Sequence, residues 1–322
     1  VQAIESIRNF GLIGVYVLEP AEPLPPMTQE DLEFERFQIK AVSAIEEELD
    51  RILKTRKQSR IQTIADMVIR NYGHLDEKIN FYQNLRSLED YVSRHSLNVA
   101  ILCAMITHVM NIRREEQYHT VCAALLHDMG KLKKHEDVYF GAPYSREDAI
   151  RNCETQEEAY SVIEDAFATE GPAIRRICQQ AAGKQLDLFP EEGKESRYKM
   201  LEGSNVLLVA NRYDEITAMT LQGTAQSEVK AAQELLEHPE VYDPETVQAL
   251  LRSINILPPG ASVELSTGEK ALVLRENKEN VLRPTVVSFR DNSILNLALP
   301  QNEDIQIVDV MKTMDNRYIL KK

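Results

Sequence analysis

The residues best suited to metal or phosphate chemistry are two histidines, an aspartate and a lysine near the middle of the chain. His127 and Asp128 are adjacent in the segment Ala-Ala-Leu-Leu-His-Asp-Met-Gly-Lys, which ends at Lys131, and His95 lies 32 residues before His127. Two imidazoles and a carboxylate form a ligand set that suits Mn, Fe, Zn, Ni or Mg. A divalent ion there would activate water and neutralise phosphoryl charge, while the Lys131 ammonium would bind a phosphate.

For these side chains to meet, the helices that carry them must pack against each other. Apolar spacing predicts one helix around His95 and a second that ends at His127 and Asp128. Two helices joined by a short turn run antiparallel, so the three side chains would meet inside a bundle. A single His-Asp pair at a helix end is common, because histidine is favourable near a helix C-terminus. The prediction of one shared site therefore depends on both segments together.

Helical periodicity extends over most of the chain. Thr155 and Glu158 form a capping-box pattern, and Gly130 is expected to cap the end of a helix. A loop is predicted between Lys133 and Cys153, and a second one over 182–196. The predicted helical segments are 30–54, 58–71, a block over 75–133, 155–168, a short helix around 174–178, 197–221, 227–237 and 244–254.

The two ends of the chain follow different patterns. Residues 11–26 read as a short apolar strand followed by a Pro-rich connector. After Pro258 the sequence alternates in five short runs separated by Thr-Gly and Asp-Asn turns, which is typical of antiparallel strands. We therefore predict a mainly α protein with an N-terminal strand, linker and helical region at 1–74, a helical domain at 75–257 and a small antiparallel β module at 258–322.

Composition narrows the class of protein. The 322 residues carry a net charge of −14, with 43% hydrophobic and 27% charged residues, as in ordinary globular chains. This acidity disfavours a nucleic-acid polymer as partner, although a locally basic pocket could still bind a small phosphorylated ligand. The apolar runs are shorter than the ~20 residues that span a bilayer, and the N-terminus lacks a signal-peptide pattern. The four cysteines show no CxxC pairing, so we expect free thiols, a cytoplasmic location and no membrane association.

The segments around His95 and His127 resemble the HD superfamily of metal-dependent phosphohydrolases, and specifically its HD-GYP branch. The similarity covers about 75–290 and includes Pro-Pro-Gly-Ala-Ser-Val-Glu-Leu-Ser-Thr-Gly-Glu at 258–269. It implies an HD-type helical bundle and a role in signalling. Many members of the branch hydrolyse the cyclic dinucleotide c-di-GMP at a centre of two or three metals, so the resemblance also raises the expectation of this activity.

This chain departs from the branch at its metal ligands. Asn211, in Leu-Val-Ala-Asn-Arg-Tyr-Asp-Glu, stands where the family has an aspartate ligand, and an amide oxygen carries no negative charge. Asp214 is the nearest carboxylate that could compensate. Gln179 and Gln180 align with the paired histidines of a second family motif, and between His135 and His238 the chain contains no histidine.

The family ligands that this chain retains imply at most one metal site of the family type. It would be formed by His95, His127, Asp128 and a weak fourth ligand, Asn211. By the same resemblance, Asp128 and Lys131 would be the catalytic residues. Substrate contacts would come from Lys131, Gln179 and Gln180. The ion would be one of Mn, Fe, Zn, Ni or Mg, and a metal-free protein is the remaining alternative.

Two functions stay open. The first is a degenerate signalling protein with little or no cyclic-dinucleotide phosphodiesterase activity, which acts by binding a nucleotide, a phosphorylated small molecule or a signalling protein. The second is an enzyme, a single-metal phosphohydrolase that acts on a nucleotide or a phosphomonoester. Fold resemblance does not choose between them, because function depends on the site.

Overall fold

A computed structural model of the chain describes residues 29–81, 83, 85–133, 145–189, 199–220 and 225–311. The predicted strand and connector at 11–26 lie outside these residues. The helices of the described part are α2 (Gln29–Thr55), α3 (Ile61–Tyr72), α4 (Tyr91–Val109), α5 (Arg114–Leu126), α6 (Arg146–Phe167), α7 (Gly171–Gln185), α8 (Glu202–Thr217), α9 (Glu228–Glu237) and α10 (Pro244–Ser253). Among the described helices, none is long and apolar enough to cross a bilayer.

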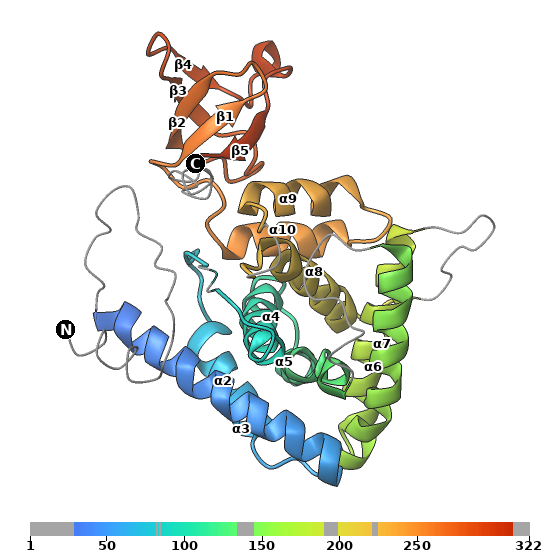
Figure 1. Cartoon of the computed structure of the whole chain (residues 1–322). Helices are drawn as coiled ribbons and strands as arrows, with labels where there is room; N and C mark the ends of the chain where they lie inside the picture. The colour runs from blue at the N-terminus through green and yellow to red at the C-terminus, as the bar shows by residue number, and fades with distance from the viewer. Residues whose placement is uncertain are drawn as a thin grey trace, which may run out of the picture.

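Helix α4 forms the centre of the helical body. Nearly all of its residues are buried, because it packs against α2, α3, α5, α8 and α10. Figure 1 shows α4 and α5 between the α2–α3 pair on one side and the α6–α7 pair on the other. A helix that is apolar on every side is stable only inside such a layer of neighbours. Polar side chains on α4, including His95, are therefore surrounded by protein.

The C-terminal residues form a five-stranded antiparallel sheet in the order β4-β3-β2-β1-β5, as the alternating sequence predicts. One face carries the buried side chains of the module, including Val263, Val273 and Val286. A hydrogen bond from Gln233 Nε2 on α9 to the Ile307 carbonyl, 2.9 Å long, joins the sheet to the helical body. The strands are β1 (Ser262–Leu265), β2 (Lys270–Arg275), β3 (Thr285–Ser288), β4 (Ile294–Asn296) and β5 (Ile307–Val310).

The predicted helical block is wrong between residue 75 and the start of α4. The described residues of this stretch are irregular or extended, with isolated bridges from Ile79 to Ile254 and from Arg86 to Thr220. Ile79 and Phe81 are two residues apart, a spacing that places both side chains on one side of an extended chain. This segment crosses α4 and reaches the end of α8.

Helix α6 begins earlier than predicted, at Arg146, because Ser145 and Asp148 form the capping box that the sequence analysis placed at Thr155. Gly130 does not cap a helix either. It lies in the 3-10 turn η1 (Met129–Lys133), where a Cβ atom would sit 2.5 Å from the Thr155 carbonyl oxygen of α6. The glycine thus permits η1 and α6 to approach closely beside the His127–Asp128 pair.

Helix α7 also differs from the prediction. Gly171 and Pro172 begin this helix rather than only ending the previous one, since proline is favourable in the first turn. The helix continues to Gln185, into the segment predicted as a loop from 182. This extra turn brings Gln185 beside α8.

Removal of residues 258–322 should lower the melting temperature of the remaining chain by several degrees and reduce its solubility. The sheet covers part of α9, and the preceding Ile256 and Leu257 are buried at 4% and 1% exposure. Thermal unfolding and light scattering measure the effect, with Ile294→Thr as the control because Ile294 is 68% exposed. An unchanged melting temperature in the truncated chain would contradict this prediction.

Candidate metal centre

The four predicted ligands meet in the interior, although they come from three parts of the chain. His95 lies on α4, His127 and Asp128 follow α5, and Asn211 lies on α8. The Nε2 atoms of the two histidines are 3.1 Å apart, and both contact Asn211 Oδ1, at 2.8 and 2.9 Å. Asp128 Oδ2 is 3.5 Å from His95 Nε2. All four side chains are buried, with exposures of 0% to 7%.

The hydrogen bonds on the far side of each ring determine where its proton lies. His127 Nδ1 is 2.8 Å from the Ala124 carbonyl oxygen, and His95 Nδ1 is 2.6 Å from Asp214 Oδ2. Both partners only accept hydrogen bonds, so Nδ1 is the protonated nitrogen in each ring. In their neutral forms the two rings therefore direct the lone pairs of their Nε2 atoms towards each other.

Asn211 adds a third acceptor to this group. Its amide nitrogen Nδ2 is 3.2 Å from Glu215 Oε1, a carboxylate oxygen that can only accept. The amide must therefore direct Nδ2 to Glu215 and its oxygen to the histidines. When both rings are neutral, three acceptor atoms lie within 3.1 Å of one another, an arrangement that a cation stabilises.

A proton on one imidazole is the alternative to a metal ion. Burial lowers the pKa of His127 to about 4, although the nearby Asp128 carboxylate opposes part of that shift. At neutral pH this ring is accordingly uncharged, and its Nε2 lone pair is available to a metal. Neutral imidazole, carboxylate and amide oxygen are all ordinary ligands of divalent ions. The residues present fit a single divalent cation.

Asp128 is the one negatively charged ligand, and its charge is already balanced. Lys131 Nζ is 2.7 Å from Asp128 Oδ2, and Gln156 Nε2 is 3.1 Å from Oδ1. Burial by itself would raise the pKa of Asp128, but the Lys131 ammonium and the two histidines lower it to about 2. Lys131 therefore keeps Asp128 ionised while it reduces the negative charge available to a metal.

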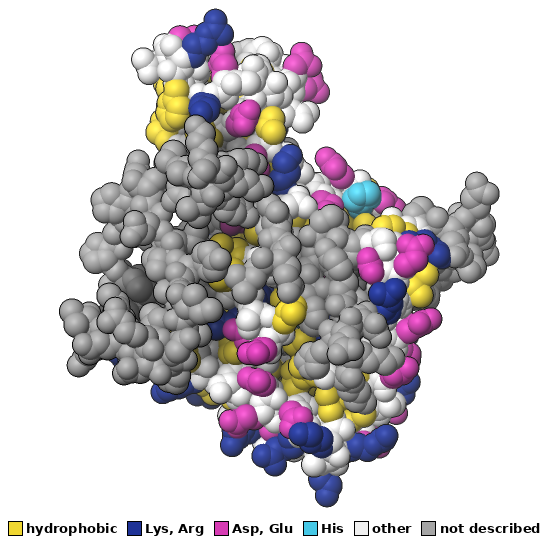
Figure 2. Space-filling model, in the orientation of Figure 1, with side chains coloured by type: hydrophobic (Ala, Val, Ile, Leu, Met, Phe, Trp, Pro, Cys, Tyr) yellow, Lys and Arg dark blue, Asp and Glu magenta, His cyan; other side chains and the backbone are white. Residues whose placement is uncertain are grey.

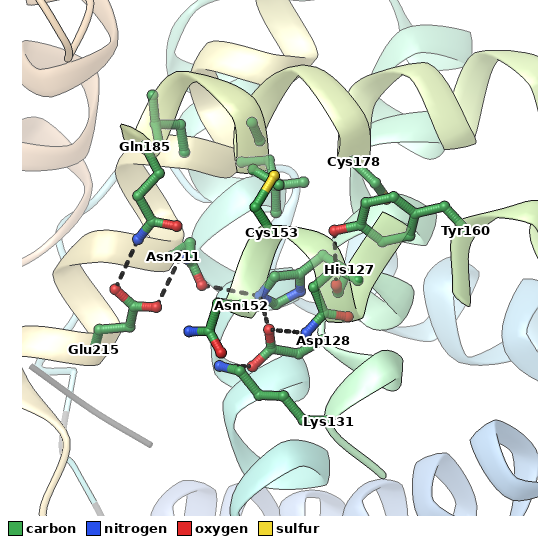
Figure 3. A pocket seen from close by; sticks show the side chains of 15 residues that line it. His127, Asp128, Lys131, Asn152, Cys153, Tyr160, Cys178, Gln185, Asn211 and Glu215 are labelled. Atoms are coloured by element: carbon green, nitrogen blue, oxygen red, sulfur yellow. Dashed lines mark hydrogen bonds and ion pairs between the residues drawn. The ribbon is translucent and has the colours of Figure 1, made fainter. Parts of the chain in front are cut away.

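A pocket opens beside this cluster, with about 430 Å³ of space, part of which is open to solvent. Figure 3 shows Lys131 and Asn152 on one side of the ligands and the Gln185–Glu215 pair beyond Asn211. Gln185 Nε2 donates to Glu215 Oε2 across 3.1 Å. The sequence analysis missed the lining residues Asn152, Cys153, Gln156, Gln185 and Glu215.

Gln179 and Gln180, predicted to bind substrate, do not line the pocket. Gln179 Nε2 bonds Glu157 at the exposed surface, at 2.5 Å. Gln180 Oε1 accepts hydrogen bonds from Leu201 N and Ser204 Oγ, both 2.9 Å long, and so anchors the start of α8. The face of α7 that lines the pocket instead carries Cys178, Ala181, Ala182 and Gln185. These residues are three, four and seven positions apart, which is the spacing of one helix face, so this signal is present in the sequence.

Asp214 is near the cluster, as its position three residues after Asn211 suggests, but it does not replace the missing carboxylate ligand. It contacts the far nitrogen of His95, Nδ1, rather than Nε2. Burial raises the pKa of Asp214, but the stronger effect of Arg86 and His95 holds it well below its usual range. The aspartate therefore orients the His95 ring as an anion behind the ligand set.

The HD domain family model matches residues 92–219, less than half of the chain but a segment that includes all four predicted ligands. No curated protein and no solved structure matches the chain. Residues 92–219 are thus similar to HD domains, a fold found in metal-dependent phosphohydrolases. Among the described residues, His95, His127 and Asp128 form a cluster that could hold a metal ion. Each side chain offers one ligand atom, and these atoms all lie within 4.8 Å of one another.

The lowered pKa of His127 predicts an acid-dependent loss of stability in the metal-free protein. An unfolded histidine binds a proton near pH 6.5, whereas folded His127 does so only near pH 4. Between these values the unfolded state holds the extra proton, so the free energy of unfolding falls by up to about 3 kcal/mol as pH drops, and this contribution is constant again below about pH 4.

Denaturant unfolding in the presence of a chelator, at pH 7 and pH 4.5, measures this loss. His127→Gln should be less stable at pH 7 but should lose less stability on acidification than the parent chain. His238→Gln, at an exposed position, is the matched control and should retain the parental pH dependence. An identical loss in the parent and in His127→Gln would contradict the assignment of a neutral, buried His127.

Proposed function

We propose that this chain is a single-metal signalling protein of the HD type that binds a nucleotide or another phosphorylated small molecule. It has little or no cyclic-dinucleotide phosphodiesterase activity, despite its resemblance to the HD-GYP branch. The observation that carries this proposal is the convergence of His95 Nε2, His127 Nε2 and Asn211 Oδ1 within 3.1 Å, beside the Asp128 carboxylate.

His95, His127, Asp128 and Asn211 would hold the ion. When bound, a divalent metal polarises phosphoryl oxygens and lowers the pKa of bound water. The chain's own Lys131 would attract a phosphate next to this position, because its ammonium lines the adjoining pocket. The amides of Asn152 and Gln156 add neutral hydrogen-bonding groups to the same wall.

A second metal of the family type has no comparable ligand set in the described residues. Apart from the candidate ligands, Lys131 and Glu215, the pocket is lined by amides, cysteines, Tyr160 and apolar side chains. Hydrolysis by a two-metal mechanism requires an ion on both the attacking and the leaving oxygen. This contrast supports binding, or slow single-metal chemistry, over cyclic-dinucleotide hydrolysis.

The ionised state of Asp128 also favours ligand binding over hydrolysis. A general base is most effective when its pKa is near the working pH, and the pKa of Asp128 is lowered to about 2. Asp128 therefore acts as a fixed anion rather than as a proton acceptor. Lys131, 2.7 Å away, fixes the carboxylate in position and contributes positive charge to the pocket.

A single-metal phosphohydrolase remains the second candidate. The observation in its favour is the adjacency of the convergent ligands and Lys131 in one pocket, since together they would bind the phosphate of a nucleotide or phosphomonoester. A nucleic-acid polymer is a poorer ligand for a chain with a net charge of −14. On the described part of the face in Figure 2, acidic and basic side chains are interspersed, which fits a small ligand or a protein partner better than a polyphosphate backbone.

The affinity for a divalent metal should rise when a negative charge is introduced at position 211 and the charge of Glu215 is removed in the same variant. Asn211→Asp places a carboxylate against both histidines, yet it also replaces the amide that donates to Glu215 at 3.2 Å. Two carboxylates at that distance repel each other. We therefore expect Asn211→Asp/Glu215→Gln to bind Mn²⁺ at least ~10-fold more tightly than the parent, a gain of about 1.4 kcal/mol.

Isothermal titration with Mn²⁺ of chelator-treated protein measures the change. Glu215→Gln alone is the matched control and should leave the affinity within a few fold of the parent. Adding His127→Ala to the double variant should abolish the gain. Unchanged affinity in the double variant would mean that residue 211 does not contribute to the metal position.

Turnover of c-di-GMP should be far below 1 s⁻¹, the low end of typical enzymes. The assay uses the 322-residue chain loaded with Mn²⁺ or, without oxygen, with Fe²⁺, and elemental analysis should give at most one ion per chain. Turnover near 1 s⁻¹ with two ions bound would overturn the proposal. Turnover of a phosphomonoester that is lost in His127→Ala would instead favour the single-metal hydrolase.

A further inference from the structure

Asp214 is a fully buried carboxylate, and each of its two oxygens accepts at least two hydrogen bonds. Oδ1 accepts from Gln83 Nε2 at 2.8 Å, Asn98 Nδ2 at 3.0 Å and one guanidinium nitrogen of Arg86 at 2.8 Å. Oδ2 accepts from a second Arg86 nitrogen at 2.7 Å and from His95 Nδ1 at 2.6 Å. Five hydrogen bonds thus fix the group that orients a candidate metal ligand.

Arg86 supplies the charge that makes this arrangement stable. Its side chain is 1% exposed and that of Asp214 is 0% exposed, so the two-pronged ion pair lies entirely inside the protein. A buried carboxylate without a counter-charge costs several kcal/mol. The guanidinium also donates to Gln83 Oε1 at 2.5 Å and lies 5.4 Å from the ring centre of Tyr91, which itself stacks on His95.

The segment that carries Arg86 lies before the part of the chain that matches the HD domain family, which begins at residue 92. The Arg86 backbone N–H donates to the Met219 carbonyl across 2.8 Å, which ties this segment to the end of α8. A buried ion pair is a weak way to stabilise a fold, since apolar residues of similar volume usually do so equally well. An anion fixed at Nδ1 of His95, however, holds a proton on that nitrogen, which apolar packing cannot do.

We propose that Arg86 is a positioning residue for the metal site, which acts through Asp214 to keep the Nε2 lone pair of His95 directed at His127 and Asn211. This inference rests on the proposed metal binding, but its effect on the His95 ring exists without metal. Arg86 touches neither the ligand atoms nor the pocket beside them. Groups of this kind, one shell behind a metal ligand, typically change metal affinity by 10–100-fold when altered.

The test compares the parent chain with Arg86→Gln and Arg86→Lys, at one neutral pH. Spectra of ¹⁵N-labelled histidine in the chelator-treated protein report which nitrogen of His95 carries the proton, with His95→Gln used to assign its signals. We expect a fixed Nδ1–H form in the parent and its loss in Arg86→Gln, together with a 10–100-fold weaker Mn²⁺ affinity. Arg86→Lys should lie between the two, because an ammonium retains the charge but not the two-pronged contact.

Arg283→Gln is the matched control, because Arg283 is a partly buried arginine of the β module that donates to the carbonyls of Asn302 and Ile305. It should lose stability without any change at His95. If Arg86→Gln does not fold, Arg86→Lys carries the test. Either variant, once folded, would overturn the proposal if it kept the Nδ1–H form and bound Mn²⁺ within threefold of the parent.

The two proposals fail in distinguishable ways. A parent chain that binds no Mn²⁺ removes the proposed metal site, yet the spectra of metal-free protein still show whether Arg86 controls the His95 ring. Normal Mn²⁺ binding with an unchanged ring in Arg86→Gln removes the role of Arg86 and leaves the metal site intact.

Discussion

The mutual approach of three hydrogen-bond acceptors inside the helical body is the constraint on which the rest of the site depends. His95, His127 and Asn211 direct lone pairs at one another because an acceptor on the far side of each group determines its orientation. Such a cluster is unfavourable unless a cation occupies it. The apolar core of the surrounding helices holds this polar centre in place.

The charges around that centre are balanced in pairs. Lys131 neutralises Asp128, and Arg86 neutralises Asp214. Glu215, which orients Asn211, is in turn contacted by Arg212 at 3.4 Å. Each pairing limits the negative charge that an incoming ion would meet, so this site differs from a typical two-metal centre in electrostatics as much as in the number of ligands. The same pairings explain how several ionised groups are tolerated in one buried region.

Close approach between elements gives the site its shape. Gly130 permits the turn after His127 to contact α6, which brings Gln156 to Asp128. The end of α7 brings Gln185 to Glu215 on α8. The pocket is thus formed where α6, α7 and α8 meet the turn after α5, and its lining combines amide, charged and apolar side chains.

The sequence by itself was sufficient to predict the helical body, the C-terminal sheet and the proximity of the candidate ligands His95, His127, Asp128 and Asn211. Periodicity and the spacing of the histidine segments are local signals. It also indicated that Asp214 would lie near this set. It misplaced Gln179 and Gln180, since the rotation of α7 about its axis depends on packing against α5 and α8. The contacts of Arg86, Gln156 and Glu215 depended on the tertiary structure. Their partners are Asp214, Asp128 and Asn211, which lie 128, 28 and 4 residues away in the chain. Only the packing of the helices determines how these partners are oriented.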